Sequence, residues 1–125
     1  MDKLVIKKCV KCGATVIVLK DCHCDNCGIV CCGQQMVELK PNSVDAAVEK
    51  HVPVYEVKGS NIVASVNHVM DADHYIEWIA LLHNGSLHKV DFAPGQTPQC
   101  TLPYHKGSTL YAYCNKHGLW SKQVQ

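Results

Sequence analysis

The sequence predicts an all-β protein with a small cysteine-rich, metal-binding part followed by an immunoglobulin-like antiparallel β-sandwich. Two observations predict this fold class. Seven of the nine cysteines lie within residues 9–32, a density typical of a segment held together by metal. From residue 54 onward, short runs rich in β-branched and aromatic residues alternate with turn signals, which is the pattern of an antiparallel sandwich.

The composition excludes several classes of protein. A chain of 125 residues with 47% hydrophobic and 18% charged residues is large enough for a core and too apolar for global disorder. The formal net charge of +1 gives no bulk attraction for nucleic acid or a membrane surface, and we expect neither partner. No apolar run approaches the roughly 20 residues of a membrane helix, and the first apolar run is too short for a signal peptide. We therefore expect a cytoplasmic protein, in which clustered cysteines more often hold metal than form disulfides.

The first cysteine pair defines a metal-binding turn between two predicted strands, residues 4–6 and 15–19. Cys9 and Cys12 are followed by Gly13. In such a turn two thiolates grip one metal while the glycine allows the tight backbone. A segment this small buries too little apolar surface to fold unaided, so a bound metal is expected to supply much of its stability.

Two other cysteine pairs compete to complete this site. Cys24 and Cys27 form a second C-x-x-C turn followed by glycine, and pairing it with the first turn gives a zinc-ribbon or rubredoxin spacing. Cys31 and Cys32, also followed by glycine, offer the alternative. Spacing favours Cys24 and Cys27 slightly and leaves both pairs open.

A break at residues 41–43, which contains a proline, marks the predicted boundary between a domain of residues 1–40 and one of residues 41–125. The asparagine or the serine of this break is expected to cap a short helix over residues 44–48. That helix would deliver residues 49–51 to a loop.

Beyond this loop every predicted element is a strand. Asn84 and Gly85, placed between two such runs, predict a tight hairpin. Further turn signals lie at residues 58–60 and 94–95. The predicted strands are residues 54–57, 61–66, 74–82, 87–92 and 108–114.

Five side chains of the second part form one candidate metal site. Cys114 and His117 are followed by Gly118, which lets the chain bend so that both turn toward one point. Five ligands exceed the four of a structural zinc site and suit octahedral iron with one open position. A thiolate opposite that position pushes electron density toward whatever binds there, which favours redox chemistry on a small oxygen species. The five residues are His51, His68, His74, Cys114 and His117.

These motifs resemble those of a known family. The C-terminal part is similar to the superoxide reductases, and the whole chain is similar to desulfoferrodoxin, their two-iron form. The matching residues are 49–53, His68, 74–79 and 114–120, together with Cys9, Cys12, Gly13, residues 31–33 and Met36 near the N-terminus.

The resemblance implies that the five residues bind a catalytic ferrous iron through four equatorial imidazoles and one axial thiolate. Superoxide would bind at the open position, gain one electron and leave as hydrogen peroxide after two protonations. Glu49 would correspond to the carboxylate that occupies this position in the oxidised resting state, and Lys50 to the cation beside it. A lysine there attracts the superoxide anion and donates a charge-assisted hydrogen bond.

The resemblance also implies a desulforedoxin-like N-terminal unit, which is small and rubredoxin-like and handles electrons at a four-cysteine iron centre. The favoured ligands of this second iron are Cys9, Cys12, Cys31 and Cys32, and the alternatives are Cys24 and Cys27. The segment that carries Cys22, Cys24 and Cys27 departs from the family, which usually has no cysteines between its first pair and its adjacent pair. The implied partners are a second copy of the chain, as a homodimer, and rubredoxin or a similar carrier as electron donor.

Other residues receive structural interpretations. Trp78 and Trp120 are expected to pack the core and shield the iron, and Cys100 is expected to be an ordinary thiol. His23, His83, His88 and His105 are expected to be ordinary surface residues or residues with satisfied hydrogen bonds. The competing function is a non-catalytic zinc-ribbon-type metal-binding or electron-transfer protein, which would have no use for the four histidines of the second part.

Overall fold

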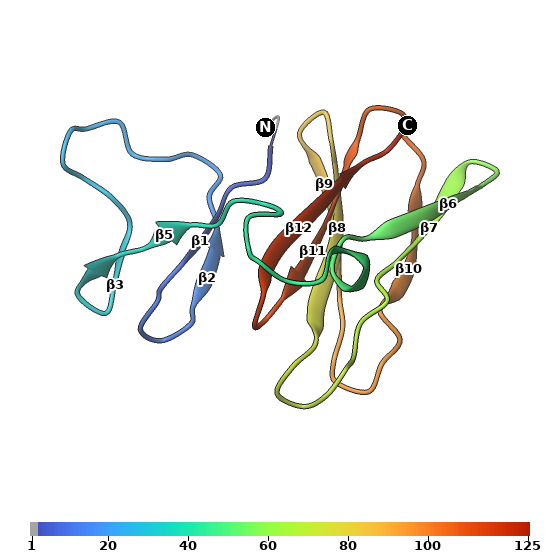
Figure 1. The fold of residues 1–125 in the computed structure, drawn as a ribbon. Coiled ribbons are helices and arrows are strands. Elements are labelled where there is room, and N and C mark those ends of the chain that lie inside the picture. The colour runs from blue at the N-terminus through green and yellow to red at the C-terminus, as the bar shows by residue number, and fades with distance from the viewer. Residues whose placement is uncertain (1–2) are drawn as a thin grey trace. The chain divides into compact units, whose positions relative to one another are not determined.

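The computed structural model describes residues 3–125, which divide into two compact units, residues 3–40 and 41–125. Every regular element of the described chain is a β-strand except for one 3-10 turn, so the predicted all-β class is confirmed. Figure 1 traces the strands of each unit. No helix in residues 3–125 has the length and apolar character needed to cross a membrane.

The first unit contains a small three-stranded antiparallel sheet and a separate short hairpin. Strand β1 (Ile6–Lys8) lies between β2 (Thr15–Ile17) and β5 (Val37–Glu38), and β3 (Val30–Cys31) pairs with β4 (Gln34–Gln35). β1 begins two residues later than the predicted strand, because its neighbours pair with residues 6–8. The buried apolar side chains described in this unit are Leu4, Ile6, Cys9, Val18 and Met36. So small a core leaves much of the unit's stability to a bound metal.

The second unit is a β-sandwich of two antiparallel sheets, which confirms the predicted architecture (Figure 1). One sheet has the strand order β10-β7-β6, and the other has the order β12-β11-β8-β9. The strands of the first sheet are β6 (Val54–Lys58), β7 (Asn61–Ser65) and β10 (Gln99–Pro103). Those of the second are β8 (Ile76–His83), β9 (Ser86–Asp91), β11 (Thr109–Cys114) and β12 (Gly118–Gln123).

Alternation along the central strands places apolar side chains between the two sheets. Ile62 and Ala64 of β7 are fully buried in one cluster with Ile79 and Leu81 of β8 and Leu110 of β11. These residues are two apart within each strand, because successive side chains of a strand point to opposite faces. The packed core therefore fixes the strand ends from which the loops with the candidate ligands emerge.

The predicted hairpin at Asn84 and Gly85 is confirmed. Both residues have positive φ, 49° and 82°, and they connect β8 to β9 with His83 paired to Ser86. A two-residue turn of this kind needs left-handed backbone at both positions, which asparagine and glycine tolerate.

The predicted helix over residues 44–48 is wrong. The structure has instead a 3-10 turn, η1 (Val48–Lys50), and Ala47 before it is extended with no side-chain cap. Asn42, a candidate cap, uses its side chain elsewhere: its Oδ1 accepts from the Ser121 amide at 2.9 Å, and its Nδ2 donates to the Ser121 carbonyl at 3.3 Å. The break thus fastens the chain to β12, and the helix loses its cap.

Two strands of the sandwich, β10 and β12, were not predicted. β10 reads Gln-Cys-Thr-Leu-Pro, and a proline normally argues against a strand, but Pro103 is its last residue and β10 is an edge strand. β12 begins at Gly118, inside the motif that drew attention as a ligand turn. The predicted strand 74–82 begins later, at Ile76, because His74 closes a bridge with Asp71.

Candidate metal centres

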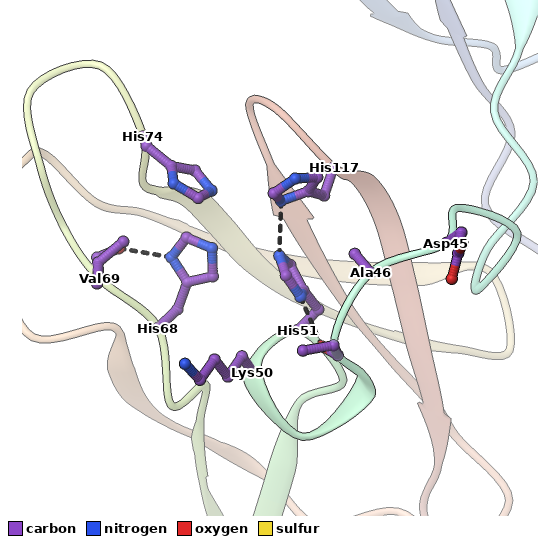
Figure 2. Close-up of a pocket in the computed structure, with 9 residues that line it drawn as sticks. Asp45, Ala46, Lys50, His51, His68, Val69, His74 and His117 are labelled. Atoms are coloured by element: carbon purple, nitrogen blue, oxygen red, sulfur yellow. Dashed lines mark hydrogen bonds between the residues drawn. The ribbon is translucent and has the colours of Figure 1, made fainter.

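The five predicted ligands of the second unit meet at one place. His51 follows η1, His68 and His74 lie in the connection between β7 and β8, Cys114 ends β11, and His117 lies in the turn before β12. Their ligand atoms all lie within 4.8 Å of one another. Figure 2 shows the four imidazoles turned toward a common centre. Segments far apart in the sequence thus supply one cluster of four histidines and one cysteine.

Backbone carbonyls set which nitrogen two of the four histidines present. His51 Nδ1 donates to the Ala47 carbonyl at 2.7 Å, and His68 Nδ1 donates to the Val69 carbonyl. Their Nε2 atoms are therefore left for the cluster, where His51 Nε2 lies 2.9 Å from His117 Nδ1. Hydrogen bonds of this kind fix the tautomer and ring orientation of metal-binding histidines.

His74 supplies a direct test of whether a metal fits. Its Nε2 is buried and has no hydrogen-bond partner in the described part of the chain. Buried polar atoms nearly always have a partner, so an unpaired nitrogen aimed into a cluster of ligands fits the role of a metal ligand. The ring arrangement is consistent with this role, because the His74 ring stands edge-on to the rings of both His68 and His117, with centroid distances of 4.6 Å and 5.0 Å.

Cys114 is fully buried beneath the imidazoles. Its Sγ lies 3.5 Å from His68 Nε2 and 3.8 Å from His117 Nδ1. The pairing of β11 with β8 shifts register between Tyr113 and Cys114, which re-aims the cysteine at the strand end. Gly118, directly after His117, has a φ of +80° and bends the chain there, as its position predicts. This bend lets His117 face the same centre as Cys114.

Two further residues hold the ligand segments in place. Asn115 Oδ1 accepts from the Tyr75 amide at 2.9 Å, and Asn115 Nδ2 donates to the Asp73 carbonyl at 3.0 Å. Trp120 stacks on the His51 ring at 4.9 Å and donates from Nε1 to the His117 carbonyl at 3.1 Å. Trp120 thus shields the centre as expected. Asn115 was not predicted to be a functional residue, and its signal in the sequence is its place between two ligands.

Trp78, by contrast, is buried and stacks on Tyr113, with ring centroids 5.8 Å apart. It lies on the face of β8 opposite Ile79, outside the core between the two sheets, and no described contact joins its ring to the imidazoles of the cluster.

The cluster opens to solvent through a pocket. Its lining residues are Asp45, Ala46, Ala47, Lys50, His51, His68, Val69, His74 and His117. Figure 2 shows Lys50 along the open side of the histidines, next to His68. Glu49, the other predicted functional residue, is exposed on η1 and does not line the pocket.

Burial favours the neutral form of two of the imidazoles, those of His68 and His117. Burial lowers the pKa of His68 below its usual 6.5. The hydrogen bond to the Val69 carbonyl raises this pKa, and electrostatic repulsion from His51 and His74 lowers it. Burial also lowers the pKa of His117, and His51 again adds to the effect. Neutral imidazole is the form that binds metal, so the cluster is prepared for a cation near neutral pH.

The first unit contains a second cluster, formed by four cysteines. Cys9 and Cys12 follow β1, while Cys31 ends β3 and Cys32 comes next, and their sulfurs lie within 4.8 Å of one another. The Cys12 amide, 3.5 Å from the Cys9 sulfur, lowers the pKa of Cys9 to about 6. A hydrogen bond between the Cys31 and Cys12 sulfurs, 3.6 Å apart, raises the pKa of Cys31 to about 12. Four such sulfurs cannot all be thiolates without a cation between them, so the set fits a metal.

Cys24 and Cys27, which spacing had favoured slightly, are not in this cluster. They are joined to each other in a disulfide across a turn, with their Cα atoms 5.7 Å apart. The preference drawn from spacing is therefore corrected, because the β3–β4 hairpin brings Cys31 and Cys32 to the first pair while the disulfide occupies the other two sulfurs.

The remaining histidines and Cys100 have no place in either cluster. His23 and His88 are exposed, whereas His83 and His105 are half-buried and stack on each other with centroids 4.1 Å apart. Cys100 is half-buried on β10, and burial raises its pKa to about 11. A thiol that keeps its proton is a poor ligand and a poor nucleophile.

Comparisons with known proteins agree with this arrangement. A family model described as Desulfoferrodoxin matches residues 43–123. The desulfoferrodoxin of Syntrophotalea carbinolica is 43% identical over 126 residues, which span 98% of each chain. A superoxide reductase of Pyrococcus horikoshii is 33% identical over 100 residues, or 62% of this chain and 87% of that one. The crystal structure of the superoxide reductase from Treponema pallidum covers 97% of this chain and 99% of its own with a TM-score of 0.72, and at 24% identity it shows a shared fold. The chain belongs to the desulfoferrodoxin family.

Proposed function

We propose that this protein is a superoxide reductase, which reduces superoxide by one electron to hydrogen peroxide in defence against oxidative stress. The observation that carries the proposal is the cluster of four imidazoles and one thiolate at the base of an open pocket beside a lysine. The ligands of the catalytic iron would be His51, His68, His74, Cys114 and His117. An iron ion held there would supply the single electron.

The donor set favours iron over zinc. Zinc in proteins takes four ligands at structural sites and three protein ligands at catalytic ones, whereas this cluster offers five. Four imidazoles and a thiolate suit an octahedral ion with one open position, and the pocket lies where a small ligand would enter.

Lys50 would capture and orient the substrate. Superoxide is an anion, so an exposed ammonium at the pocket raises its local concentration and its rate of encounter. Once the anion has entered, the same ammonium can donate a charge-assisted hydrogen bond to a substrate oxygen. The opening of the pocket to solvent lets water supply the two protons.

Glu49 would serve the resting state by covering the open position with its carboxylate. Because Glu49 lies on η1 outside the pocket lining, this role needs the η1 segment to rearrange. Lys50 is on the same short turn, so that rearrangement would move both side chains together.

The first unit would hold a second iron at Cys9, Cys12, Cys31 and Cys32 and pass electrons to the catalytic centre. Its donor would be rubredoxin or a similar small electron carrier, and the chain would act as a homodimer. Clustered free thiols are typical of a reducing compartment, which supports a cytoplasmic location.

Pulse radiolysis of the iron-loaded, reduced protein tests the function. We expect rapid loss of superoxide and one peroxide formed for each superoxide consumed. A dismutase would instead yield one peroxide for every two superoxide ions, and a non-catalytic zinc protein would leave the decay of superoxide at its buffer rate. Metal analysis of the same sample separates these cases, because iron is required in the first and zinc alone is found in the last.

A further inference from the structure

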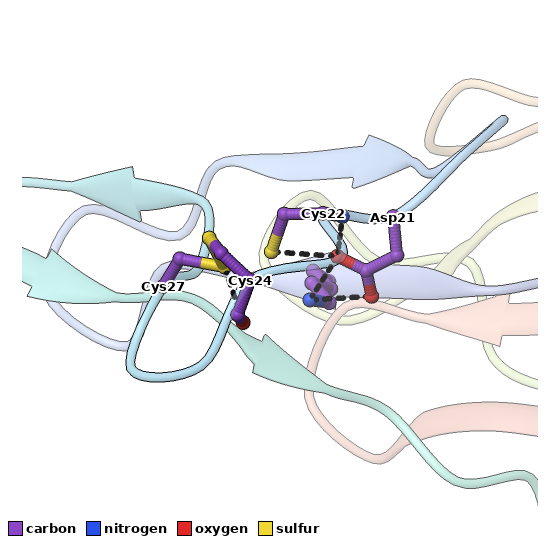
Figure 3. Close-up of a disulfide and its surroundings, with 5 residues drawn as sticks. Asp21, Cys22, Cys24 and Cys27 are labelled. Carbon is purple, nitrogen blue, oxygen red and sulfur yellow. Dashed lines mark hydrogen bonds and ion pairs between the residues drawn. A yellow bond between two sulfur atoms is a disulfide. The ribbon is translucent and has the colours of Figure 1, made fainter.

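The loop between β2 and β3 contains three cysteines that neither metal cluster uses. We call residues 21–28 the cysteine loop. Within it, Cys24 and Cys27 form a disulfide, and Cys22 is a free thiol (Figure 3). Among residues 3–125 this is the one disulfide, and the other seven cysteines are free. One small unit thus contains two kinds of cysteine chemistry.

The turn between the two cysteines allows the disulfide to open and reform locally. Asn26 has φ of +57°, a left-handed conformation that asparagine tolerates and that reverses the chain within the C-x-x-C segment. The two Cα atoms are 5.7 Å apart, a separation that a disulfide spans without moving the backbone. Thiols three residues apart on such a turn stay neighbours when reduced, so oxidation needs no refolding.

The ends of the cysteine loop are held independently of the disulfide. Asp21 forms an ion pair with Lys7 of β1 at 2.9 Å and accepts the Cys22 amide at 2.9 Å. The ion pair raises the pKa of Lys7 and lowers that of Asp21. At the other end, Gln35 packs so closely on Gly28 that a Cβ there would lie 3.0 Å from its Cδ. Opening the disulfide would therefore free the turn and leave both ends of the loop in place.

The two cysteines differ in the exposure of the residue as a whole. Cys24 is exposed, whereas Cys27 is half-buried. An outside thiolate therefore reaches Cys24 first, and Cys27 is the natural leaving group. Exposed disulfides of short C-x-x-C segments are the ones that exchange readily, in contrast to buried structural disulfides.

We propose that Cys24 and Cys27 form a thiol–disulfide exchange site that takes two electrons from a dithiol reductant. A thiolate of the reductant bonds to Cys24 Sγ and breaks the Cys24–Cys27 bond, and the Cys27 thiolate that leaves takes a proton from water. The second thiolate of the reductant then attacks the reductant's first sulfur, which is bonded to Cys24 in the mixed disulfide. This releases the Cys24 thiolate, which is protonated in turn. The protein gains two electrons and two protons, and the reductant becomes a disulfide.

The site is separate from the four-cysteine cluster in both residues and chemistry. The sulfurs of Cys24 and Cys27 are bonded to each other, so they cannot serve as the ligands that their spacing suggests. The alternative is that reduction turns this pair into metal ligands, and the experiment distinguishes the two.

The test uses the full-length, iron-loaded protein in anaerobic buffers that contain reduced and oxidised dithiothreitol in varied ratios. Thiols are blocked with N-ethylmaleimide, and the peptides are analysed by mass spectrometry. We expect Cys24 and Cys27 to become modified together, with a tenfold change in their reduced-to-oxidised ratio for about 30 mV, as a two-electron couple requires. Cys22 should be modified at every ratio, and the iron content should stay constant.

Variants locate the attacked sulfur. The Cys27→Ser variant, treated with oxidised glutathione, should form a mixed disulfide at Cys24, and the Cys24→Ser variant should form one at Cys27 at least several-fold more slowly. Cys22→Ser, which removes the free thiol of the same loop, is the matched control and should leave the Cys24–Cys27 redox couple unchanged. The proposal is overturned if Cys24 and Cys27 stay unmodified by N-ethylmaleimide at all ratios, or if both are modified at all ratios. It is also overturned if added Zn²⁺ protects both reduced thiols from modification, because the pair would then be a metal site.

Discussion

Asn115 is predicted to set the metal affinity of the five-ligand cluster without touching the metal. Its side chain joins the segment of His74 to the segment of Cys114 and His117 through hydrogen bonds of 2.9 Å to the Tyr75 amide and 3.0 Å to the Asp73 carbonyl. Replacing Asn115 with Ala removes both bonds. Without them, a single backbone bond, from the Asn115 amide to the Tyr75 carbonyl at 3.2 Å, still joins the two segments, so the metal-free segments are held less firmly and metal binding must order them.

The expected size follows from these two bonds. Each is worth about 1 kcal/mol, so about 2 kcal/mol is lost. At about 1.4 kcal/mol for each factor of ten, this weakens metal binding by up to about 30-fold. The figure lies within the roughly 10- to 100-fold range seen when outer-shell partners of metal ligands are removed. Competition with a chelator measures the affinity, using Co²⁺ as a spectroscopic probe of the thiolate.

Asn42 supplies a matched control. Its side chain also makes two hydrogen bonds, both to Ser121, but it joins no two ligand segments. Its φ of +59° makes glycine the suitable replacement. Asn42→Gly should lower the free energy of unfolding of the second unit and leave Co²⁺ affinity nearly unchanged. If Asn115→Ala binds Co²⁺ as tightly as the parent protein, or if both variants lose affinity equally, the positioning role is refuted.

Four other predictions follow from the two clusters. Replacing Lys50 with Ala should slow superoxide capture by roughly tenfold and weaken its dependence on ionic strength, since the steering charge is gone, and an unchanged rate in pulse radiolysis would contradict this. Replacing Cys114 with Ser should abolish the sulfur-to-iron charge-transfer band and spare the absorption of the first unit; survival of the band would exclude this thiolate as a ligand. The pKa values of His68 and His117 in the folded state are lowered below 6.5. As the pH falls through and below 6.5, the unfolded chain therefore binds more protons than the folded chain, and the folded state loses stability. The metal-free protein should therefore unfold at lower urea concentration at pH 5.5 than at pH 7.5, and replacing both histidines with Gln should flatten this slope. Chelation should deprotect residues 3–40 in hydrogen exchange and leave the sandwich core protected, whereas equal loss in both units would show that the metals support one common fold.

Local signals in the sequence were sufficient for most of the sandwich, including the edge strands β6 and β9, but not for the edge strands β10 and β12. The pattern of alternating apolar residues placed β7, β8 and β11 because their inner faces are fully buried, and Asn84 with Gly85 placed the hairpin because only left-handed backbone fits there. The helix at residues 44–48 failed for a non-local reason, since Asn42 bonds to Ser121, which is 79 residues away. β10 at its edge is half-exposed and ends in proline, so its pairing with β7 is visible only in three dimensions.

The two clusters differ in how far a sequence can identify their ligands. The histidine–cysteine set combines two side-chain types, and every member lies within one of the matched motifs, so one combination satisfies a five-ligand centre. A four-thiolate centre accepts any two suitably spaced pairs, and this chain supplies three pairs. Chain geometry makes the choice: the hairpin of β3 and β4 turns at Cys32, with φ of +55°, and Gly33, and this turn carries Cys31 to within 3.6 Å of the Cys12 sulfur. The turn at Asn26 joins the remaining pair to each other, so the same spacing that suggested a metal site produces a disulfide.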